Sequence, residues 1–329
     1  MNDVIKPLTF ALLRDLADGR FHSGQQLAQQ HDVSRATVNN ALHDLSLLGL
    51  ALFSVPGRGY RLAKPLVWLD VVKIRQALGD MVAVLNLELL DSASSSNSLL
   101  LKRATEGAPS GTVLAVEWQA AGRGRFGRTW HAALGDSLTF SLLWRFNYGL
   151  AGLAGLSLAV GVALIRALRH FCFTEVCLKW PNDVLNQHGK LAGILVEAQG
   201  DMMGPSAVVI GIGLNVRLPE ILSTAVEQAS SSLADMTENL PDRNQLFAQI
   251  LLELVGVLNS FNTQGFEPLR EEWERYHCWQ NRLVNLLLPD GKSETGKILG
   301  VTKEGALRLK NAQGEHIFHS GEISVRLTK

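Results

Sequence analysis

The stretch GRGRFGRTW, from Gly122 to Trp130, places three arginines between glycines and ends on an indole. Neighbouring cations repel one another and glycines cost ordering entropy, so this spacing needs a reason. Guanidinium groups match phosphate or carboxylate oxygens, and glycines let a backbone close over a ligand. We interpret the stretch as a mobile flap over an anion. A disordered RNA-binding segment would be longer and repetitive, and a plain solvated turn would not need this spacing.

Three other motifs carry polar groups that could work beside such a flap. KWPND, residues 179–183, ends a predicted strand with a proline turn and leaves the amide of Asn182 and the carboxylate of Asp183 at its tip. Lys190 lies in GKLAGILVE, at the start of an apolar strand. Alone it could be a charge on a sheet edge, but beside the flap it is a candidate counter-charge for a substrate carboxylate. GIGLNV, residues 211–216, adds Asn215 and glycines that allow close approach.

The overall composition describes a soluble protein with no global charge. The chain has 329 residues, enough for two or three domains, and 31 basic residues balance 31 acidic ones. Anion binding must therefore depend on local clusters. No Ser-His-Asp or Cys-His pattern suggests a covalent nucleophile, and no GxxxxGK[ST] or GxGxxG leads from a strand into a helix, so the common nucleotide folds are not indicated.

The cysteines and the apolar runs favour a cytoplasmic location. The three cysteines form no CxxC pair and leave an odd thiol, which suits a reducing cytosol, and we expect them to be packing residues. The N-terminus lacks a signal-peptide pattern. Residues 146–165 carry no charge and are long enough to span a bilayer. Their glycines favour a buried helix that leads into a sheet, so we expect no membrane partner.

The first segment, to about residue 64, has the pattern of a winged helix-turn-helix. Helical spacing covers residues 8–16, Ser23 opens a capping box before a helix over 25–30, and Ser34 can cap a third helix. The alternation in residues 50–62, broken by a Pro-Gly turn, predicts a hairpin wing. The third helix would enter a major groove. The candidate DNA-binding residues are Ser34, Arg35, Thr37, Asn39, Asn40, His43 and Arg58. A helical docking domain with a solvated polar face is the alternative.

The rest of the chain predicts an α+β domain followed by a small β-barrel. Strands are expected at 83–90, 112–119, 137–144, 175–179, 191–197 and 207–214, and helices at 156–169 and 243–261. Their mixed order indicates a mixed sheet and not a regular doubly wound one. From about residue 278, four glycine-containing turns separate short apolar alternations, which is typical of a small barrel.

The four motifs AGRGRFGRTW, KWPNDVL, GKLAGILVE and GIGLNV, in this order and spacing, resemble those of the biotin protein ligases. The winged helix resembles that of their bifunctional bacterial form. The resemblance implies a winged-helix domain over 1–64, a class II synthetase-like catalytic domain over 65–275 and an SH3-like β-barrel over 276–329. It implies biotin activation by ATP with Mg²⁺ to biotinyl-5'-AMP, and transfer to a lysine of the biotin carboxyl carrier protein of acetyl-CoA carboxylase. It also implies that the adenylate-bound homodimer binds operator DNA and represses biotin biosynthesis.

The resemblance also assigns site residues. Lys190 would neutralise the biotin carboxylate or the α-phosphate, and Arg125 would hold the adenylate. Asp183 would orient or deprotonate the acceptor amine, with support of a metal as the competing role. No protein metal cage is expected, because Mg²⁺ would arrive with the nucleotide. The biotin contacts would be Ser95, Ser96, Asn97, Gln119, Arg123, Gly124, Arg125 and Lys190. The nucleotide contacts would be Arg128, Asn182, Asn215, Glu322 and Arg326.

Two alternatives stay open at this point. A transcription factor could sense a carboxylic acid without catalysis, although such a sensor would not need both Lys190 and the intact flap. A lipoate ligase would share a similar catalytic core, although the flap, the two following motifs and the winged helix favour biotin.

Overall fold

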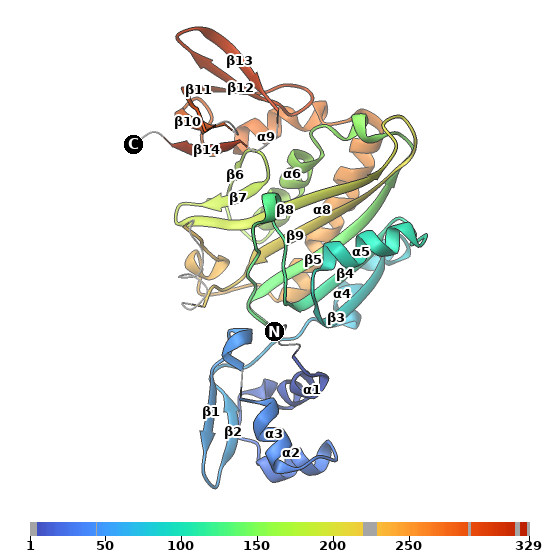
Figure 1. Cartoon of the computed structure of the whole chain (residues 1–329), viewed down its shortest axis with the longest axis vertical. Coiled ribbons are helices and arrows are strands. Elements are labelled where there is room, and N and C mark those ends of the chain that lie inside the picture. The colour runs from blue at the N-terminus through green and yellow to red at the C-terminus, as the bar shows by residue number, and fades with distance from the viewer. Residues whose placement is uncertain (1–4, 44, 220–228, 289–290, 320–322, 328–329) are drawn as a thin grey trace.

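The computed structural model describes residues 5–43, 45–219, 229–288, 291–319 and 323–327. Figure 1 shows three parts: an N-terminal lobe, a central sheet flanked by helices, and a C-terminal β domain beyond one edge of that sheet. The predicted α+β class is confirmed. The predicted domain boundaries stay predictions.

The N-terminal lobe is a three-helix unit with a two-stranded wing. Its elements are α1 Pro7–Asp15, α2 Gly24–Gln30, α3 Arg35–Ala41, β1 Leu52–Val55 and β2 Gly59–Leu62. The hydroxyl of Ser34 accepts the backbone N–H of Thr37 at 3.1 Å and so caps α3, as predicted. Val38 of α3 is buried, as are Leu42 and Leu45 just after the helix. The outer face of α3 is therefore free to contact a partner.

The central part is a seven-stranded mixed sheet covered on both faces. Its strands are β3 Asn86–Ala93, β4 Thr112–Gln119, β5 Ser137–Phe146, β6 Cys177–Lys179, β7 Asp183–Asn186, β8 Gly189–Gly200 and β9 Ser206–Asn215. The strand order is β3-β4-β5-β9-β8-β7-β6, with only the β3–β4 pair parallel. Its helices are α4 Val71–Leu78, α5 Ser96–Thr105, α6 Leu156–His170, α8 Arg243–Gln264 and α9 Arg270–Tyr276.

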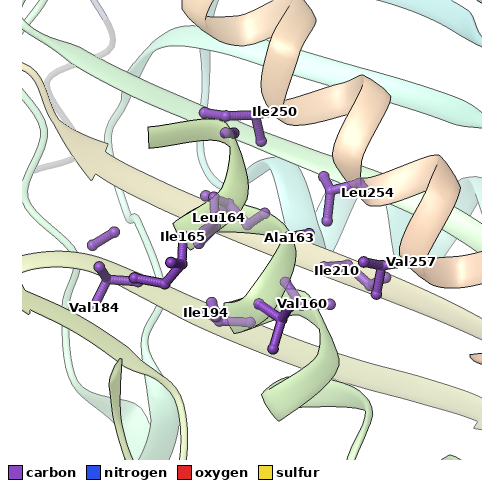
Figure 2. Packing of buried hydrophobic residues seen from close by; sticks show 14 of the residues in the cluster. Val160, Ala163, Leu164, Ile165, Val184, Ile194, Ile210, Ile250, Leu254 and Val257 are labelled. Atoms are coloured by element: carbon purple, nitrogen blue, oxygen red, sulfur yellow. The ribbon is translucent and has the colours of Figure 1, made fainter. Parts of the chain in front are cut away.

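Alternation along the strands decides which face each helix covers. Leu143 and Val209 pack with α5 on one face, while Leu142 and Ile210 pack in the large core on the other. Figure 2 shows part of this large core, where side chains of α6 and α8 meet those of β8 and β9. One predicted boundary was wrong and one strand was missed. The expected first strand starts at Asn86 because Gly79–Ala83 forms a 3-10 helix, and β7 was not expected at all.

The charge-free segment over 146–165 becomes a strand end, a turn and most of α6. Eleven residues of α6 are buried, so the buried-helix interpretation is confirmed. Residues 150–170 and 243–264 are long and apolar enough to cross a membrane. However, 56% of an 18-residue stretch of each segment is buried inside the protein. Their apolar surface is therefore largely used by the core.

The C-terminal domain is a five-stranded antiparallel sheet whose core is continuous with the central one. Its strands are β10 Leu283–Leu287, β11 Ser293–Val301, β12 Leu307–Asn311, β13 Gly314–Phe318 and β14 Ser324–Leu327, in the order β13-β12-β11-β10-β14. Val284 and Ile298 are fully buried in the same cluster as α6 and α8. The indole N–H of Trp180 donates to the carbonyl of Gly305 at 3.0 Å. The domain is thus packed beside the end of β6.

The connection between the first two parts is held by buried contacts. Leu134 is packed in the core of the N-terminal lobe, and its N–H donates to the carbonyl of Leu48 at 3.2 Å. Within the central part, the carboxylate of Glu117 accepts the N–H of Leu69 at 2.6 Å and pairs with Arg243 at 2.7 Å. Since only 5% of the Glu117 side chain and 4% of the Arg243 side chain is exposed, these charges depend on each other.

The expectation that all three cysteines are packing residues is wrong. Cys177 and Cys278 form a disulfide, and Cys172 is a free, exposed cysteine. The pairing joins residues that are 101 positions apart, which spacing along the chain does not reveal.

The buried ion pair gives a stability prediction. Glu117→Gln should lower the free energy of unfolding by about 3 kcal/mol, because it leaves the Arg243 guanidinium buried without a counter-charge. Urea denaturation followed by circular dichroism measures the loss. Glu106→Gln is the matched control, since the Lys102–Glu106 pair is 3.8 Å apart with side chains 73% and 58% exposed, and it should cause no measurable change. Equal midpoints for the two variants would contradict the dependence on Glu117.

Candidate active site

A pocket lies where the start of α5 meets the middle of β8 and β9. It encloses about 480 Å³, open space at its mouth included, which suits a small molecule. Every residue predicted to contact biotin lines it, and so does Asn182. The lining residues are Ser95, Ser96, Asn97, Gln119, Arg123, Gly124, Arg125, Trp130, Phe140, Asn182, Lys190, Gly193, Ile194, Leu195, Gly211, Ile212 and Gly213.

The floor of the pocket is a set of glycines on one face of the sheet. In β9, Ile210, Ile212 and Leu214 are buried, while Gly211 and Gly213 alternate with them. A Cβ on Gly213 would lie 2.2 Å from the Trp130 ring, and a Cβ on Gly211 would lie 2.2 Å from Asn97 Oδ1.

On β8, a Cβ on Gly193 would come within 3.2 Å of the Lys190 side chain and 3.3 Å of the Trp130 ring. These three glycines, at 193, 211 and 213, let polar and aromatic side chains lie directly on the backbone.

The serine-rich element forms one wall. The N–H of Ser96 donates to Gln119 Oε1 at 2.7 Å, and its hydroxyl lies 2.7 Å from that of Ser141. The amide of Asn97 donates to Glu197 Oε2 at 3.0 Å, and its oxygen accepts from Ser141. This buried network fixes the side chains before any ligand arrives. It can present both donors and acceptors to a polar ring system.

The flap is a small hairpin that closes over the pocket. The N–H of Trp130 donates to Gly122 O at 2.8 Å, and the N–H of Gly124 donates to Arg128 O at 2.7 Å. A Cβ on Gly122 would lie 2.4 Å from Trp130 O, so this crossing requires glycine. Phe126, at the turn, has a φ of 56° and is 52% exposed.

Each pocket-facing cation of the flap has a partner. Arg123 pairs with Glu197 at 2.6 Å, and Arg125 donates to Asn182 Oδ1 at 3.1 Å. Burial lowers the pKa of Arg125 below its usual value, while the negative charge of Asp183 opposes that change. A guanidinium that has lost part of its hydration interacts more strongly with an anion. The flap is thus suited to hold a phosphate or carboxylate.

Asp183 and Lys190 form the central ion pair of the site. Their side chains are 2.7 Å apart and only 13% and 23% exposed. Lys190 Nζ also lies 5.8 Å from the centre of the Trp130 ring. Asp183 opens β7, and Lys190 follows it on β8, which runs antiparallel to β7. A substrate anion can take the place of Asp183 at the ammonium group.

Lys179 adds a second lysine that the sequence analysis did not select. Burial lowers its pKa, Asp183 raises it, and Lys190, Arg128 and Arg326 lower it further, in this order. The side of the site beyond Asp183 is therefore rich in positive charge, which suits a polyphosphate.

Within the part of the chain that the structure describes, no group of three or more His, Cys, Asp or Glu residues is placed to hold an ion. Asp183 is the carboxylate nearest Lys190 and is already paired with it. A magnesium ion fits here only when phosphate oxygens supply most of its ligands.

Of the other predicted nucleotide contacts, Arg128, Asn215 and Arg326 do not line the pocket. Arg128 and Arg326 are exposed and act on Lys179 through their charge. Asn215 is buried at the end of β9 and donates to the carbonyl of Ser231 at 2.9 Å. Glu322 lies outside the described residues. The sequence reasoning missed Trp130 and the three floor glycines as lining residues, although the alternation in GIGL was a usable signal.

The winged helix presents its candidate DNA-binding residues to solvent. All seven are exposed: Ser34, Arg35, Thr37, Asn39, Asn40, His43 and Arg58. Asn39 accepts a hydrogen bond from the Tyr60 hydroxyl at 3.2 Å, so the wing is tied to α3. Helix α3 and the wing therefore form one continuous surface.

A winged helix joined to a central ligase-type pocket and a small β domain defines a class of regulatory enzyme. The model of the biotin/lipoate A/B protein ligase family matches residues 89–215, that of an HTH domain matches 10–61, and that of the biotin protein ligase C-terminal domain matches 281–326. The chain is 38% identical over 327 residues to the bifunctional ligase/repressor BirA of Escherichia coli, covering 99% of each chain. It belongs to the biotin protein ligase family.

Two further relatives agree with this assignment. The Bacillus subtilis bifunctional ligase/repressor BirA is 30% identical over 310 residues, covering 94% of this chain and 95% of that one. The structure of the biotin protein ligase from Aquifex aeolicus in complex with biotin and ATP matches with a TM-score of 0.62 and 28% identity. It covers 74% of this chain and 99% of that chain.

The glycine floor gives a second prediction. Gly213→Ala should push the Trp130 ring off the sheet, because the new Cβ would overlap it. Acrylamide quenching of tryptophan emission should rise, and the rise should vanish when Trp130→Phe is added. Gly256→Ala, in α8 where a Cβ would meet nothing within 4 Å, is the control and should leave quenching unchanged. Unchanged quenching in Gly213→Ala would show that the ring does not need this floor.

Proposed function

We propose that this protein is an ATP-dependent biotin protein ligase that also acts as a transcriptional repressor. The observation that carries the proposal is the Asp183–Lys190 pair beneath a cationic flap, in a chain that also has a winged helix. Biotin, ATP and Mg²⁺ are the substrates and cofactor of the reaction.

In the first half-reaction, a biotin carboxylate oxygen attacks the α-phosphorus of ATP and pyrophosphate leaves. Both reactants are anions, so the site must reduce their repulsion. Lys190, released from Asp183, neutralises the carboxylate or the α-phosphate. Arg123, Arg125 and Gly124 of the flap then cover the adenylate, and Ser95, Ser96, Asn97 and Gln119 hold the ring system. The proposed nucleotide contacts are Arg128, Asn182, Asn215, Glu322 and Arg326.

In the second half-reaction, the acceptor lysine amine attacks the acyl carbon, AMP leaves and the amine loses a proton. Asp183 is the proposed group that orients this amine or takes its proton. The acceptor is the biotin carboxyl carrier protein of acetyl-CoA carboxylase. Positioning and charge neutralisation suffice for both steps, because no covalent intermediate with the protein is needed.

The repressor function uses the exposed surface of α3 and the wing. The adenylate-bound protein forms a homodimer, and the two recognition helices then read an inverted repeat in the operator of biotin biosynthesis genes. The site of action is the cytoplasm. A sensor without catalysis is less suitable, because it would not need a lysine paired to a carboxylate under the flap. The bicyclic polar ring of biotin also suits the Ser96–Asn97 wall better than the dithiolane of lipoate does.

Exchange of labelled pyrophosphate into ATP tests the first half-reaction directly. Lys190→Ala should slow this biotin-dependent exchange about a hundredfold, because the charge that stabilises the developing anhydride is lost. Lys102→Ala, an exposed lysine of α5, should exchange at the wild-type rate. Circular dichroism confirms that both variants are folded. Undiminished exchange in Lys190→Ala would remove this residue from the step, and no exchange in the wild type would contradict the ligase function.

Salt-dependent DNA binding tests the repressor function. A duplex selected from a random pool in the presence of biotin and ATP serves as ligand, and fluorescence anisotropy gives the affinity. Arg35→Ala should weaken binding and reduce the slope of log K against log salt by about one, as expected for one lost phosphate contact. Lys73→Ala, an exposed lysine of α4 outside the winged helix, should leave the slope unchanged. Failure to select any duplex would contradict DNA binding.

A further inference from the structure

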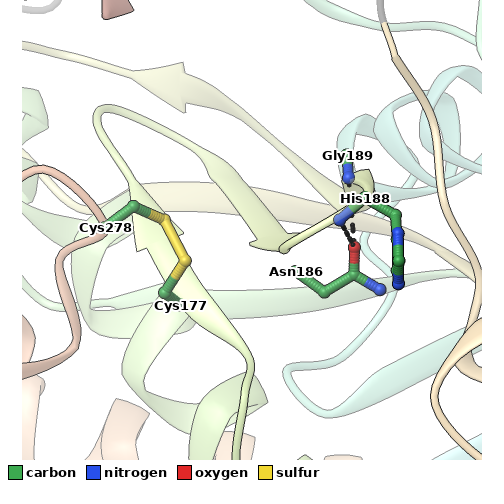
Figure 3. The surroundings of a disulfide bond; sticks show 5 residues. All are labelled: Cys177, Asn186, His188, Gly189 and Cys278. Carbon is green, nitrogen blue, oxygen red and sulfur yellow. Dashed lines mark hydrogen bonds between the residues drawn. A yellow bond between two sulfur atoms is a disulfide. The ribbon is translucent and has the colours of Figure 1, made fainter.

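A disulfide connects the edge strand of the central sheet to the segment that enters the C-terminal domain. Cys177 opens β6 and Cys278 follows α9, and their Cα atoms are 5.2 Å apart, within the range of natural disulfides. Figure 3 shows the bond between these two segments. Because the paired cysteines are 101 residues apart, the bond limits how far the C-terminal domain can move from the sheet.

The backbone brings the two cysteines together independently of the bond. Leu178 and His277 form a parallel bridge, and the N–H of Cys278 donates to Leu178 O at 2.8 Å. The buried His277 ring stacks on Trp273 with centroids 4.6 Å apart. These contacts hold the two sulfur atoms near each other, so the bond can break and form again without refolding.

A short series of contacts leads from the disulfide to the catalytic ion pair. Trp279, the residue after Cys278, has its ring centre 5.1 Å from Lys179 Nζ. Lys179 lies opposite Asp183 in the β6–β7 register, and Asp183 pairs with Lys190 at 2.7 Å. Arg326 of the C-terminal domain acts on Lys179 through its charge. Moving the segment at Cys278 therefore changes the surroundings of the cationic side of the site.

Both cysteine residues are partly exposed. Accessible disulfides are the labile and regulatory ones, and in a reducing compartment a disulfide is usually of this kind. The remaining cysteine, Cys172, is exposed and unpaired with either of them.

We propose that Cys177 and Cys278 form a reversible redox switch that controls nucleotide binding. In the oxidised state, the bond holds Trp279 and the C-terminal domain against β6 and supports binding of ATP. In the reduced state, this segment has more freedom and ATP binds more weakly. The effect on ATP rests on the proposed ligase function, whereas formation of the bond does not.

The oxidant is a low-molecular-weight disulfide such as glutathione disulfide. One cysteine thiolate attacks it and releases one small thiol, which gives a mixed disulfide. The second cysteine thiolate then attacks the protein sulfur and releases the other small thiol. In balance, two protein thiols lose two electrons and two protons, and one small disulfide is reduced to two thiols.

The experiment compares oxidised and reduced full-length protein carrying Cys172→Ser, which leaves only the two cysteines of interest. After equilibration with glutathione and glutathione disulfide, intact mass should show the loss of two hydrogens, and no thiol should titrate. The oxidised form should melt about 5 °C higher. In biotin-dependent pyrophosphate exchange, reduction should raise KM for ATP about fivefold with a smaller change in kcat.

Cys177→Ser and Cys278→Ser, each added to Cys172→Ser, separate redox control from a merely structural role. Both variants should show the KM for ATP of the reduced protein. Adding glutathione disulfide should not change this KM. A protein that stays reduced at every glutathione ratio, or equal KM values in the two states, would overturn the proposal. If neither state exchanges pyrophosphate, the ligase function fails, while mass and melting temperature still show whether the bond forms.

Discussion

The binding pocket depends on three glycines that let side chains lie directly against the backbone of the sheet. Gly193, Gly211 and Gly213 leave no Cβ on the pocket face of β8 and β9, so the Trp130 ring, Lys190 and Asn97 can lie against the sheet. The opposite face of β9 is filled by Ile210, Ile212 and Leu214. A period-two sequence of glycine and large aliphatic residues therefore makes a core on one side and a binding floor on the other.

Much of the site could be predicted because its residues lie in short motifs at the ends of strands. The flap, Lys190 and the serine-rich element all reach one pocket, since β5, β8 and β9 are neighbours in the sheet. The sequence did not show that Asp183 starts a strand of its own. β7 has only four residues, and a proline turn directly before it hides its start.

The proposed nucleotide side was harder to predict because its residues meet only through tertiary packing. Lys179 comes from β6, Arg326 from β14 and Trp279 from the loop after α9, and no local pattern connects them. The same holds for Cys177 and Cys278. The chain has an odd number of cysteines and no cysteine motif, so the sequence predicted no disulfide. Cys177 and Cys278 are close because the segment after α9 lies beside the edge strand of the sheet. Sequence spacing carries no information on such a contact.

The neutral composition of the chain fits the way in which this site handles charge. Lys190 pairs with Asp183, Arg123 with Glu197, and Arg125 contacts Asn182. In the proposed mechanism an arriving anion takes the place of a carboxylate or an amide at these cations, so it does not enter a field of unpaired positive charge. This exchange keeps the cations positioned and prevents their mutual repulsion from opening the flap. In the proposed mechanism the displaced Asp183 remains beside the substrate, so the group released in the first step is available to the amine in the second.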